Sequence, residues 1–410
     1  MGSANVQDPD IKPPDGGLRA WLQVLSGHLI LFNVWGYINS FGIFQPYYVV
    51  ALNSNASDVS WVGSLQIFFV YFLGAFSGRA TDAGYLRTIL VVGLFLQLLG
   101  VFMTSLASSY WQVLLAQGIC QGIGDGLLLC PVVAIVSTYF TTKRTMAISI
   151  SASGGATGGL VFPAIAQNLL NRIGFPWTVR VMGFVILFNA AIILTFMRQR
   201  LPPRQAGPLI EWKAFTELSY TLFTCGGFFC FWAVYFAYYY VRSFGSDIIH
   251  VSNYTSFSIL MIINGLGLPG RIIPAYVSDR YFGTLNTFIV VSIAAAIVMY
   301  CWIAIDSLGG LIAFAVVYGF FGGGMQSLFP AALSSLTTDI SKAGVRIGMV
   351  FSLVSIASLT GPPIAGALVD VDQGRYLGAQ LFGGTSIILG CVFLIGARCA
   401  KCGMGVWNRI

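Results

Sequence analysis

Two charged residues lie inside long apolar stretches of the 410-residue sequence, where charged side chains are rare and usually functional. Asp125 lies near the middle of the apolar run 111–138, and Arg271 lies towards the end of the run 254–278. A carboxyl group in an apolar interior must be protonated or paired, so Asp125 either binds a proton or hydrogen-bonds a neighbouring helix. A guanidinium group stays charged, so Arg271 needs an anion, either from a solute or from Asp279 eight residues further on.

Uncharged polar and aromatic residues in the apolar runs are further candidates for the wall of a binding cavity. The amide side chains are Asn33, Asn39, Gln121, Asn264 and Gln326, and the aromatic candidates are Trp232 and Tyr235. The two aromatic residues could stack on a ring-bearing solute, or they could belong to the aromatic belt at the membrane surface. Together with Asp125 and Arg271, these residues form the predicted solute-binding and coupling set.

The composition shows what kind of protein must position these residues. Charged residues make up only 9% of the chain and hydrophobic residues 57%, whereas a soluble protein has about 25% charged residues. So few charges cannot cover a water-facing surface of ordinary size, and intrinsic disorder is excluded for the same reason. The eight cysteines lie mostly in apolar runs, which indicates packing rather than a disulfide scaffold. The solvent for most of the chain must therefore be lipid.

Apolar runs of about 20 residues, the length needed to cross a bilayer, occur twelve times. They fall near 20–47, 60–78, 88–108, 111–138, 146–170, 176–197, 215–241, 254–278, 286–305, 309–336, 346–369 and 376–398. We therefore predict an all-α polytopic membrane protein with twelve transmembrane helices in two pseudo-symmetric six-helix bundles. The predicted parts are an N-terminal tail 1–19, a first bundle 20–197, a linker 198–214, a second bundle 215–398 and a C-terminal tail 399–410.

The basic residues predict the orientation in the membrane. With the N-terminus in the cytoplasm, sixteen of the 21 Lys and Arg residues fall in cytoplasmic segments, four fall outside and Arg271 lies within a span. Both termini are therefore predicted to be cytoplasmic, and we expect a plasma-membrane location. The net charge of +7 reflects this topology and implies no nucleic-acid partner. The sequons at Asn55 and Asn253 would face outwards, either as glycosylation sites or as chance matches.

The second half of the sequence repeats features of the first. Pro131 and Pro330 are 199 residues apart, and Asp82 and Asp279, in the loops after the second and eighth runs, are 197 residues apart. Matches in the same order at nearly one offset indicate a duplicated six-helix unit. Such parallel repeats are typical of transporters whose halves move about a site near the middle of the membrane.

Four segments resemble motifs of a known family. They are Gly78-Arg-Ala-Thr-Asp82-Ala-Gly84-Tyr-Leu-Arg87, Gly270-Arg271-Ile-Ile-Pro274-Ala-Tyr-Val-Ser278-Asp279-Arg280, Pro14-Asp15-Gly16-Gly17-Leu-Arg-Ala20-Trp21 and Tyr139-Phe140-Thr-Thr-Lys143-Arg144-Thr-Met-Ala147. The first two resemble the loop 2–3 signature of the major facilitator superfamily and its counterpart in the second half. The last two resemble motifs of the monocarboxylate porter family in its fungal variant. The resemblance covers essentially the whole chain and implies the major facilitator fold and solute transport.

The first of these segments has the composition of a gate between the two bundles. Gly78 would allow two helices to approach closely. Asp82 would accept hydrogen bonds from a helix N-terminus and pair with an arginine such as Arg87. Gly84 completes this gating set in the first half, and Asp279 and Arg280 complete it in the second half. The alternative is that these charges only keep the loops in water, and we favour the gate.

The sequence also departs from the family it resembles. The resemblance implies that Arg271 binds a substrate carboxylate, but animal members place an Asp one helical turn earlier, where this chain has Gly267. They also carry a Lys in the first helix, near the position of Asn39. Loss of both residues weakens a lactate-type proton mechanism and favours a larger or different solute. It leaves Asp125 or His28 as the candidate proton-binding group, although we favour a hydrogen-bonded core histidine as the role of His28.

Three classes of function are compatible with these features. We favour a secondary active transporter that moves a small carboxylate-bearing or ring-bearing organic solute by alternating access, with export of a secondary metabolite as the favoured direction. Its alternative is proton-coupled uptake of a monocarboxylate or vitamin. A non-transporting sensor is less favoured because the chain ends about twelve residues after the last span. We expect no enzyme, because the spans hold no metal-ligand cluster and no Gly-x-Ser-x-Gly nucleophile elbow. An ATP-driven pump is excluded by the missing Gly-x-x-x-x-Gly-Lys phosphate-binding loop.

The partners predicted from the sequence are few. They are the lipid bilayer, a small-molecule solute and, as a candidate coupling ion, protons. We expect no cofactor and no metal, and we expect the protein to function as a monomer.

Overall fold

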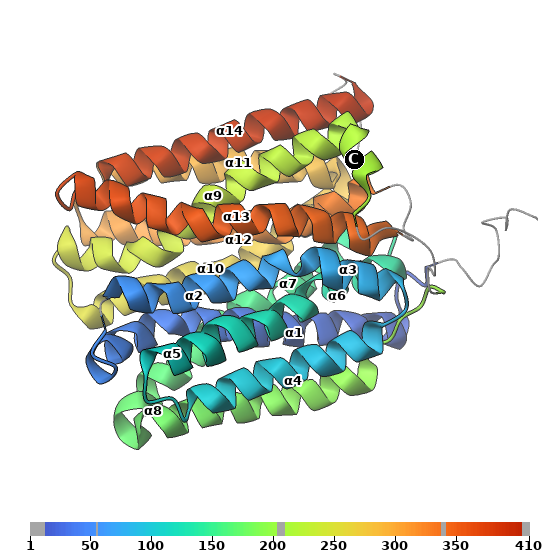
Figure 1. Cartoon of the computed structure of the whole chain (residues 1–410). Coiled ribbons are helices and arrows are strands. Elements are labelled where there is room, and N and C mark those ends of the chain that lie inside the picture. Colours follow the sequence, from blue (N-terminus) through green and yellow to red (C-terminus); the bar gives the residue numbers. More distant parts are fainter. Residues whose placement is uncertain (1–12, 55, 203–209, 338–341, 404–410) are drawn as a thin grey trace, which may run out of the picture.

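The computed structural model of the chain describes residues 13–54, 56–202, 210–337 and 342–403, without the side chains of residues 56, 57 and 253. All regular structure in these residues is helical (Figure 1). Long apolar helices are expected for a chain surrounded by lipid, because a helix satisfies every backbone hydrogen bond internally.

The first bundle contains six membrane helices, some of them built from more than one helical element. The elements are α1 (Gly17–Ala51), α2 (Ala56–Phe72), α3 (Gly74–Asp82), α4 (Leu86–Thr104), α5 (Tyr110–Val113), the π-helical η2 (Leu114–Gln121), α6 (Gly122–Tyr139), α7 (Arg144–Ala152) and α8 (Gly154–Phe196). α2 and α3 continue one another, as do α5, η2 and α6. The 43 residues of α8 are too long for one crossing of about 30 Å. Gly174, with φ 77° and ψ 167°, breaks α8 in a conformation that glycine alone adopts readily.

The second bundle repeats this plan. Its elements are η3 (Trp212–Thr216), α9 (Leu218–Asp247), α10 (Asn253–Val277), η4 (Ser278–Phe282), α11 (Thr284–Cys301), η5 (Trp302–Ala304), α12 (Leu308–Leu336), α13 (Ala343–Val371) and α14 (Leu377–Cys402). Several helices extend one or two turns beyond the expected apolar runs. α9, for example, reaches Asp247 rather than residue 241, because polar residues at the membrane surface continue the helix.

Ten stretches of the described residues are long and apolar enough to cross a membrane. One of them, 144–196, makes two crossings because the chain breaks at Gly174. α1 is not one of the ten because His28, Asn33 and Asn39 interrupt its apolar sequence, yet its 35 residues lie alongside the other helices (Figure 1). The predicted architecture of twelve helices in two bundles is confirmed.

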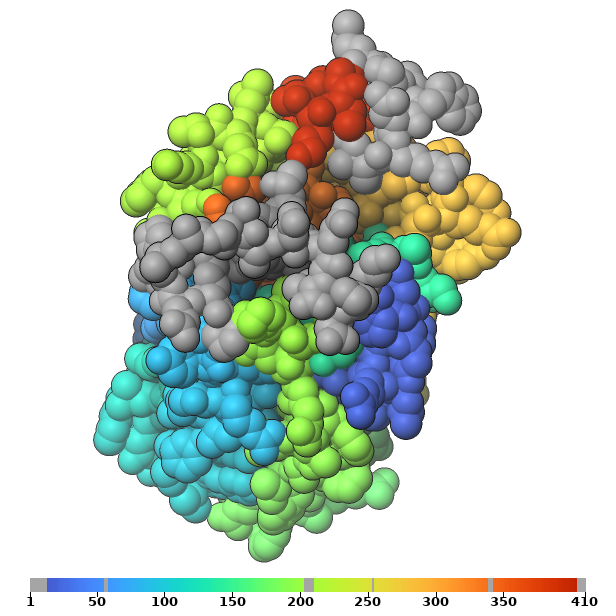
Figure 2. Space-filling model, turned by 90° about the vertical axis from the view of Figure 1, so that its right-hand side faces the viewer, coloured from blue at the N-terminus to red at the C-terminus, as the bar shows by residue number. Residues whose placement is uncertain are grey.

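Both ends of the described chain lie at the same end of the helix bundle, on the right of Figure 1. The described parts of the linker, residues 198–202 and 210–214, lie there too, and we call this end the terminal face. Figure 2 shows this face, with the first bundle, blue to green, in the lower part of the view and the second bundle mainly above it. The two bundles meet along a boundary between these parts, and the candidate site lies on that boundary.

Candidate functional site

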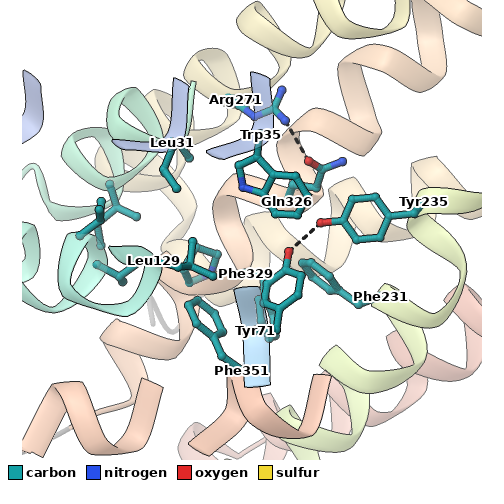
Figure 3. Close-up of a pocket in the computed structure, with 15 residues that line it drawn as sticks. Leu31, Trp35, Tyr71, Leu129, Phe231, Tyr235, Arg271, Gln326, Phe329 and Phe351 are labelled. Carbon is teal, nitrogen blue, oxygen red and sulfur yellow. Dashed lines mark hydrogen bonds between the residues drawn. The ribbon is translucent and has the colours of Figure 1, made fainter. Parts of the chain in front are cut away.

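A cavity of about 50 Å³ lies between the two bundles (Figure 3). Its wall is mostly aromatic and aliphatic, with two polar side chains from the second bundle, Arg271 and Gln326. The other lining residues are Leu31, Trp35, Tyr71, Leu129, Val132, Val133, Ile148, Ala152, Phe231, Tyr235, Phe329, Pro330 and Phe351. This volume holds about one or two water molecules, so an organic solute requires the bundles to move apart.

Arg271 of α10 provides the charge in this cavity. Its side chain donates to the Gly267 carbonyl at 3.0 Å and to Oε1 of Gln326 at 2.9 Å, and the residue is only 6% exposed. Within the described part of the chain, no carboxylate lies within ion-pair distance of Arg271. The pairing with Asp279 considered from the sequence is therefore wrong. A buried guanidinium group without an anionic protein partner favours an anionic ligand.

Glycines in α10 and α12 determine how Arg271 is held. A Cβ at Gly267 would lie 2.5 Å from Nη1 of Arg271, and a Cβ at Gly323 would lie 2.7 Å from the Gly267 Cα. The two helices therefore approach closely, and the carbonyl of residue 267 contacts Arg271 directly. This carbonyl occupies the role that the resemblance gave to an Asp side chain, but it brings no negative charge. The positive charge of Arg271 thus remains available to a solute.

Aromatic residues from both bundles close the cavity around this charge. The hydroxyl groups of Tyr71 and Tyr235 are 2.6 Å apart, and Trp35 stacks on Tyr235 with ring centroids 5.7 Å apart (Figure 3). Trp35 and Tyr71 belong to the first bundle and Tyr235 to the second. Sequence reasoning selected Tyr235 but missed Trp35 and Tyr71. Trp35 lies one helical turn before the predicted cavity residue Asn39, and so on the same face of α1. This spacing was the signal that could have identified Trp35.

Several predicted residues lie elsewhere. Trp232 donates to Oγ1 of Thr360 at 3.0 Å and packs on Phe382, so it faces α13 and α14 rather than the cavity. Asn33 accepts a hydrogen bond from Asn189 at 2.7 Å inside the first bundle. These two residues are therefore not part of the cavity wall.

Asn39 and Asn264 meet beside a glycine of α8. A Cβ at Gly159 would lie 2.7 Å from Nδ2 of Asn39 and 3.0 Å from Oδ1 of Asn264. Helices of both bundles thus approach each other at this point, although neither Asn39 nor Asn264 lines the cavity. His28, the other candidate for proton binding, contacts the Ile150 carbonyl at 3.0 Å and Thr157 at 3.1 Å. This arrangement fits a hydrogen-bonded core histidine.

Asp125 lies in a buried polar network of the first bundle and does not line the cavity. Gln66 of α2 donates to its carboxylate at 3.0 Å, and Gln97 of α4 donates to it at 2.6 Å. Gln117 extends the network towards Tyr48, whose hydroxyl donates to it at 2.8 Å. Amide groups stabilise a buried carboxylate and can also reorient around a protonated one, so this network accommodates both the structural hydrogen bond and the proton-binding role expected for Asp125.

At the terminal face, the predicted gating aspartates join the two bundles. Asp82 accepts hydrogen bonds from the amides of Gly344 at 3.1 Å and Val345 at 2.9 Å, in the first turn of α13. Asp279 accepts from the amides of Thr145 at 3.2 Å and Met146 at 2.8 Å, in the first turn of α7. A carboxylate at a helix N-terminus is stabilised by the exposed amides and by the helix dipole. We call these two sets of contacts the gate.

The two predicted gating arginines have other partners. Arg87 donates to the Leu194 carbonyl, which corrects the expectation that it pairs with Asp82. Arg280 donates to the Tyr276 hydroxyl at 2.6 Å and lies over the Tyr281 ring. Gly84 has φ 92°, which explains the glycine in the turn between α3 and α4.

A glycine seam crosses between the bundles beside Asp82. Gly74 and Gly78 of α3 face Gly344 and Gly348 of α13, and we call these four residues the seam. A Cβ at Gly78 would lie 2.0 Å from the Gly344 carbonyl oxygen, and one at Gly348 would lie 2.1 Å from the Gly74 carbonyl oxygen. Main chain packs directly on main chain here, as in other small-residue contacts between membrane helices.

Substitution at the seam tests whether this contact matters for function. We expect Gly78→Ala to lower the transport rate at least about tenfold, because the added methyl group cannot fit and a misfit of this kind costs about 1–3 kcal/mol. Gly309→Ala is the matched control, since a Cβ there meets nothing within 4 Å. Equal transport by the two variants at equal surface expression would contradict a functional seam.

The two predicted glycosylation sequons are at Asn55 and Asn253. Asn55 lies outside the described residues, and Asn253 is the first residue of α10, with a side chain that the structure does not describe.

With this geometry established, comparison with known proteins identifies the family. Residues 27–309 match the family model of the Major Facilitator Superfamily. The chain belongs to this superfamily. Its proteins named below are transporters, so this chain is a multi-pass integral membrane transporter, and lipid and a small-molecule solute are its partners.

Curated members of the Major Facilitator Superfamily align along nearly the whole chain. An "MFS-type transporter" of Gibberella zeae is 48% identical over 388 residues, which cover 94% of this chain and 88% of the relative. The "MFS-type transporter dbaD" of Emericella nidulans is 38% identical and covers 95% and 91% of the two chains. The "Aspyridones efflux protein apdF" of the same species is 35% identical and covers 95% and 80%.

Solved structures of transporters show the same fold. The human organic anion transporter MFSD10 (TETRAN) superposes with a TM-score of 0.73 and 14% identity, covering 95% of this chain and 100% of that one. The Major Facilitator Superfamily transporter FucP in its outward conformation gives a TM-score of 0.70 with 15% identity, covering 93% of this chain and 98% of that one. At this identity the likeness concerns the fold alone.

Proposed function

We propose that this transporter exports a small organic solute that carries a carboxylate and a ring. The observation that carries the proposal is Arg271, a buried cation in the cavity without an anionic partner in the described chain. The aromatic residues Trp35, Tyr71 and Tyr235 offer flat surfaces for a ring beside it. The efflux protein for aspyridones among the relatives supports the outward direction.

The finer family assignment and the orientation form part of the same proposal. We assign the chain to the monocarboxylate porter family, because the segments 14–21 and 139–147 carry its motifs. The excess of Lys and Arg near the terminal face supports placing that face in the cytoplasm. The protein would then function as a monomer in the plasma membrane with both termini inside the cell. The gate would close the cytoplasmic end while the cavity opens outwards.

Transport assays in vesicles test the proposed direction and solute class. Inside-out vesicles that contain the protein should accumulate a ring-bearing carboxylate, whereas its neutral methyl ester should accumulate much less. Accumulation of acid and ester to the same extent would contradict a role for the charge of Arg271. Uptake confined to right-side-out vesicles would favour the alternative function, import of a monocarboxylate or vitamin.

Proton coupling through Asp125 is compatible with export and with the alternative of uptake, and we include it in the proposal. This residue is a fully buried carboxylate held by amide groups in the first bundle, and no cation from the described residues pairs with it. A carboxylate in such a place can bind and release a proton as its surroundings change.

The coupling role of Asp125 predicts a specific loss. Asp125→Asn should remove the response of transport to a pH gradient while leaving exchange of solute across the membrane at least partly intact. The amide preserves the size of the side chain and its oxygen acceptor but cannot carry a proton. Vesicle transport with and without an imposed pH gradient measures this. A gradient response retained in the variant would remove Asp125 from proton coupling.

A further inference from the structure

The helix ends held by the gate occupy equivalent positions in the two repeats. Thr145 and Gly344 are 199 residues apart, as are Met146 and Val345. The backbone amides of each helix end donate hydrogen bonds to an aspartate of the opposite bundle. This aspartate is Asp279 for α7 and Asp82 for α13. The gate contacts can form only if the receiving helix ends, at the start of α7 and of α13, lie in the correct place.

A second carboxylate holds the start of α7 from within its own bundle. Asp15, two residues before α1, accepts hydrogen bonds from the amides of Thr141 and Thr142, the latter at 3.0 Å, and from the Thr141 hydroxyl. Its own amide donates to the Tyr139 carbonyl at 3.1 Å. Asp15 thereby fixes the short connection between α6 and α7, directly before the residues that Asp279 contacts.

The backbone before α1 is shaped for this contact. Asp15 has φ 51°, a left-handed conformation that Asp tolerates better than most residues, and Gly17 has φ 80°. Trp21, one turn into α1, packs edge-on against Phe140 with ring centroids 5.3 Å apart. The Asp-Gly-Gly…Trp motif therefore brings the beginning of α1 onto the connection that leads into α7.

The start of α13 has an equivalent second carboxylate. Glu211, shortly before η3 and α9, accepts from Nζ of Lys342 at 2.9 Å and from Nε of Arg346 at 3.2 Å. Glu217 also pairs with Arg346, with one contact at 3.0 Å, and the Tyr220 hydroxyl donates to the Arg346 carbonyl at 2.7 Å. Asp15 and Glu211 are 196 residues apart, and each precedes the first helix of a bundle.

We propose that Asp15 and Glu211 are the positioning residues of the gate. Each holds the start of α7 or α13 in place, so that Asp279 or Asp82 from the opposite bundle can meet it. When the bundles separate at the terminal face, the contacts of Asp82 and Asp279 must break, whereas those of Asp15 and Glu211 do not cross between bundles and remain. The receiving helix ends thus stay prepared for closure throughout the cycle.

Both positioning residues remain charged near neutral pH. Burial alone would raise the pKa of Asp15, but hydrogen bonds from Thr141 and Thr142 lower that pKa below its ordinary value. Burial likewise opposes ionisation of Glu211, but Lys342 and Arg346 lower the pKa of Glu211. A carboxylate with a lowered pKa loses its contacts only when the pH falls below its ordinary titration range. Changes between pH 6 and 8 therefore leave both carboxylates ionised.

The two residues act through different partners, which provides an internal control. Asp15 contacts backbone amides and a hydroxyl, so the side-chain oxygen of Asp15→Asn can still accept part of these hydrogen bonds. Glu211 contacts two cations, so Glu211→Gln loses the attraction between opposite charges. The neutral variant of the same size is therefore expected to keep the gate stable at Asp15 but not at Glu211.

A native cysteine reports on the gate without any knowledge of the solute. Cys130 of α6 is 0% exposed, and its Sγ lies 3.5 Å from the Gly344 carbonyl oxygen across the boundary between the bundles. Separation at the terminal face would expose it. The purified full-length protein in lipid nanodiscs is treated with a membrane-impermeant maleimide, and the rate of modification at Cys130 is read by mass spectrometry of its peptide.

We expect Asp15→Ala and Glu211→Ala each to raise the modification rate of Cys130 about fivefold, the ratio that corresponds to loss of one helix-capping contact. The Cys130 modification rate of Asp15→Asn should stay close to that of the unchanged protein. The rate of Glu211→Gln should rise as much as that of Glu211→Ala. Asp306→Ala, which changes an exposed carboxylate in the loop before α12, should have no effect.

Two results would overturn the proposal. One is an unchanged Cys130 rate in Asp15→Ala and Glu211→Ala when Asp82→Asn raises that rate. The other is an equal rise in Asp15→Ala and Asp15→Asn. If Asp15→Ala does not accumulate, Thr141→Val removes one of the donors to Asp15 and should raise the rate by a smaller factor, and no rise would count against the proposal. Because no solute is used, failure here is separate from failure of the proposed transport function.

Discussion

Arg271→Gln is expected to reduce transport of a carboxylate solute by about 100-fold, measured as kcat/KM in vesicles, because removing one partner of a buried charge pair costs about 2–5 kcal/mol. Transport of the methyl ester of the same solute should change little. Gln at this position is polar but uncharged, and the comparison of acid with ester isolates the contribution of the charge. The preference for acid over ester should therefore disappear in the variant.

Two further variants make this result specific. Arg271→Lys keeps a positive charge but cannot contact both the Gly267 carbonyl and Gln326 as the guanidinium does, so we expect partial transport at about one tenth of the original rate. Arg172→Gln changes an exposed arginine near the turn at Gly174 and should transport normally. An equal loss for acid and ester in Arg271→Gln would indicate a structural role instead of carboxylate binding.

Asp82→Asn is expected to abolish transport, which means a decrease of more than about tenfold to the background of the assay. Surface expression should stay unchanged. The two oxygens of Asp82 accept from two amides in the first turn of α13. An Asn side chain offers one oxygen, places an NH2 group near the other amide and lacks the charge that interacts with the helix dipole. The closed terminal face should then be less stable.

The modification rate of Cys130 distinguishes a weakened gate from misfolding. A weakened gate raises this rate in protein that still purifies as a monodisperse species, and Asp279→Asn should act in the same direction through α7. Asp306→Asn serves as the matched control. Normal transport by Asp82→Asn would show that the contact with α13 is dispensable and that the charge only keeps the loop in water.

The architecture could be predicted because lipid imposes strong constraints on composition. A chain with 9% charged residues must form apolar helices of bilayer length, and the polar break after residue 197 divides them into two groups. The offset between Asp82 and Asp279 then indicated the duplication. The gap between the predicted runs 146–170 and 176–197 contains Gly174, where the structure breaks α8. Helical hydrogen bonding reaches up to this break from both sides, so α8 is otherwise continuous.

The cavity was harder to predict, because sequence gives the depth of a residue in the membrane but not its direction around the helix axis. Trp232 and Tyr235 lie within one turn of α9, yet Tyr235 faces the cavity and Trp232 faces α13 and α14. Residues three apart on a helix differ in direction by only about 60°, so their spacing alone would place both on one face. An apolar pattern on all sides of a buried membrane helix leaves this direction undetermined, and contacts between helices then decide it.

The contacts of Asp15 show a different limit. The motif was visible in the sequence, but its partners Thr141 and Thr142 are more than 120 residues away. Nothing in the spacing indicates which helix connection the N-terminal segment meets. Packing of Trp21 on Phe140 brings the two segments together, and a tertiary contact of this kind is set by the fold as a whole.

The position of Arg271 shows one further consequence of the duplication. Arg271 and Gly74 are 197 residues apart, the same offset that relates Asp279 to Asp82, so they are the same position in the two copies of the duplicated unit. In the first copy this position belongs to the seam, where a Cβ has no room, and in the second it faces the cavity. One position of the repeated unit thus packs main chain against main chain in the first copy and supplies the charge of the cavity in the second, so the duplication separates bundle contact and solute contact at this position although both copies contribute an aspartate to the gate.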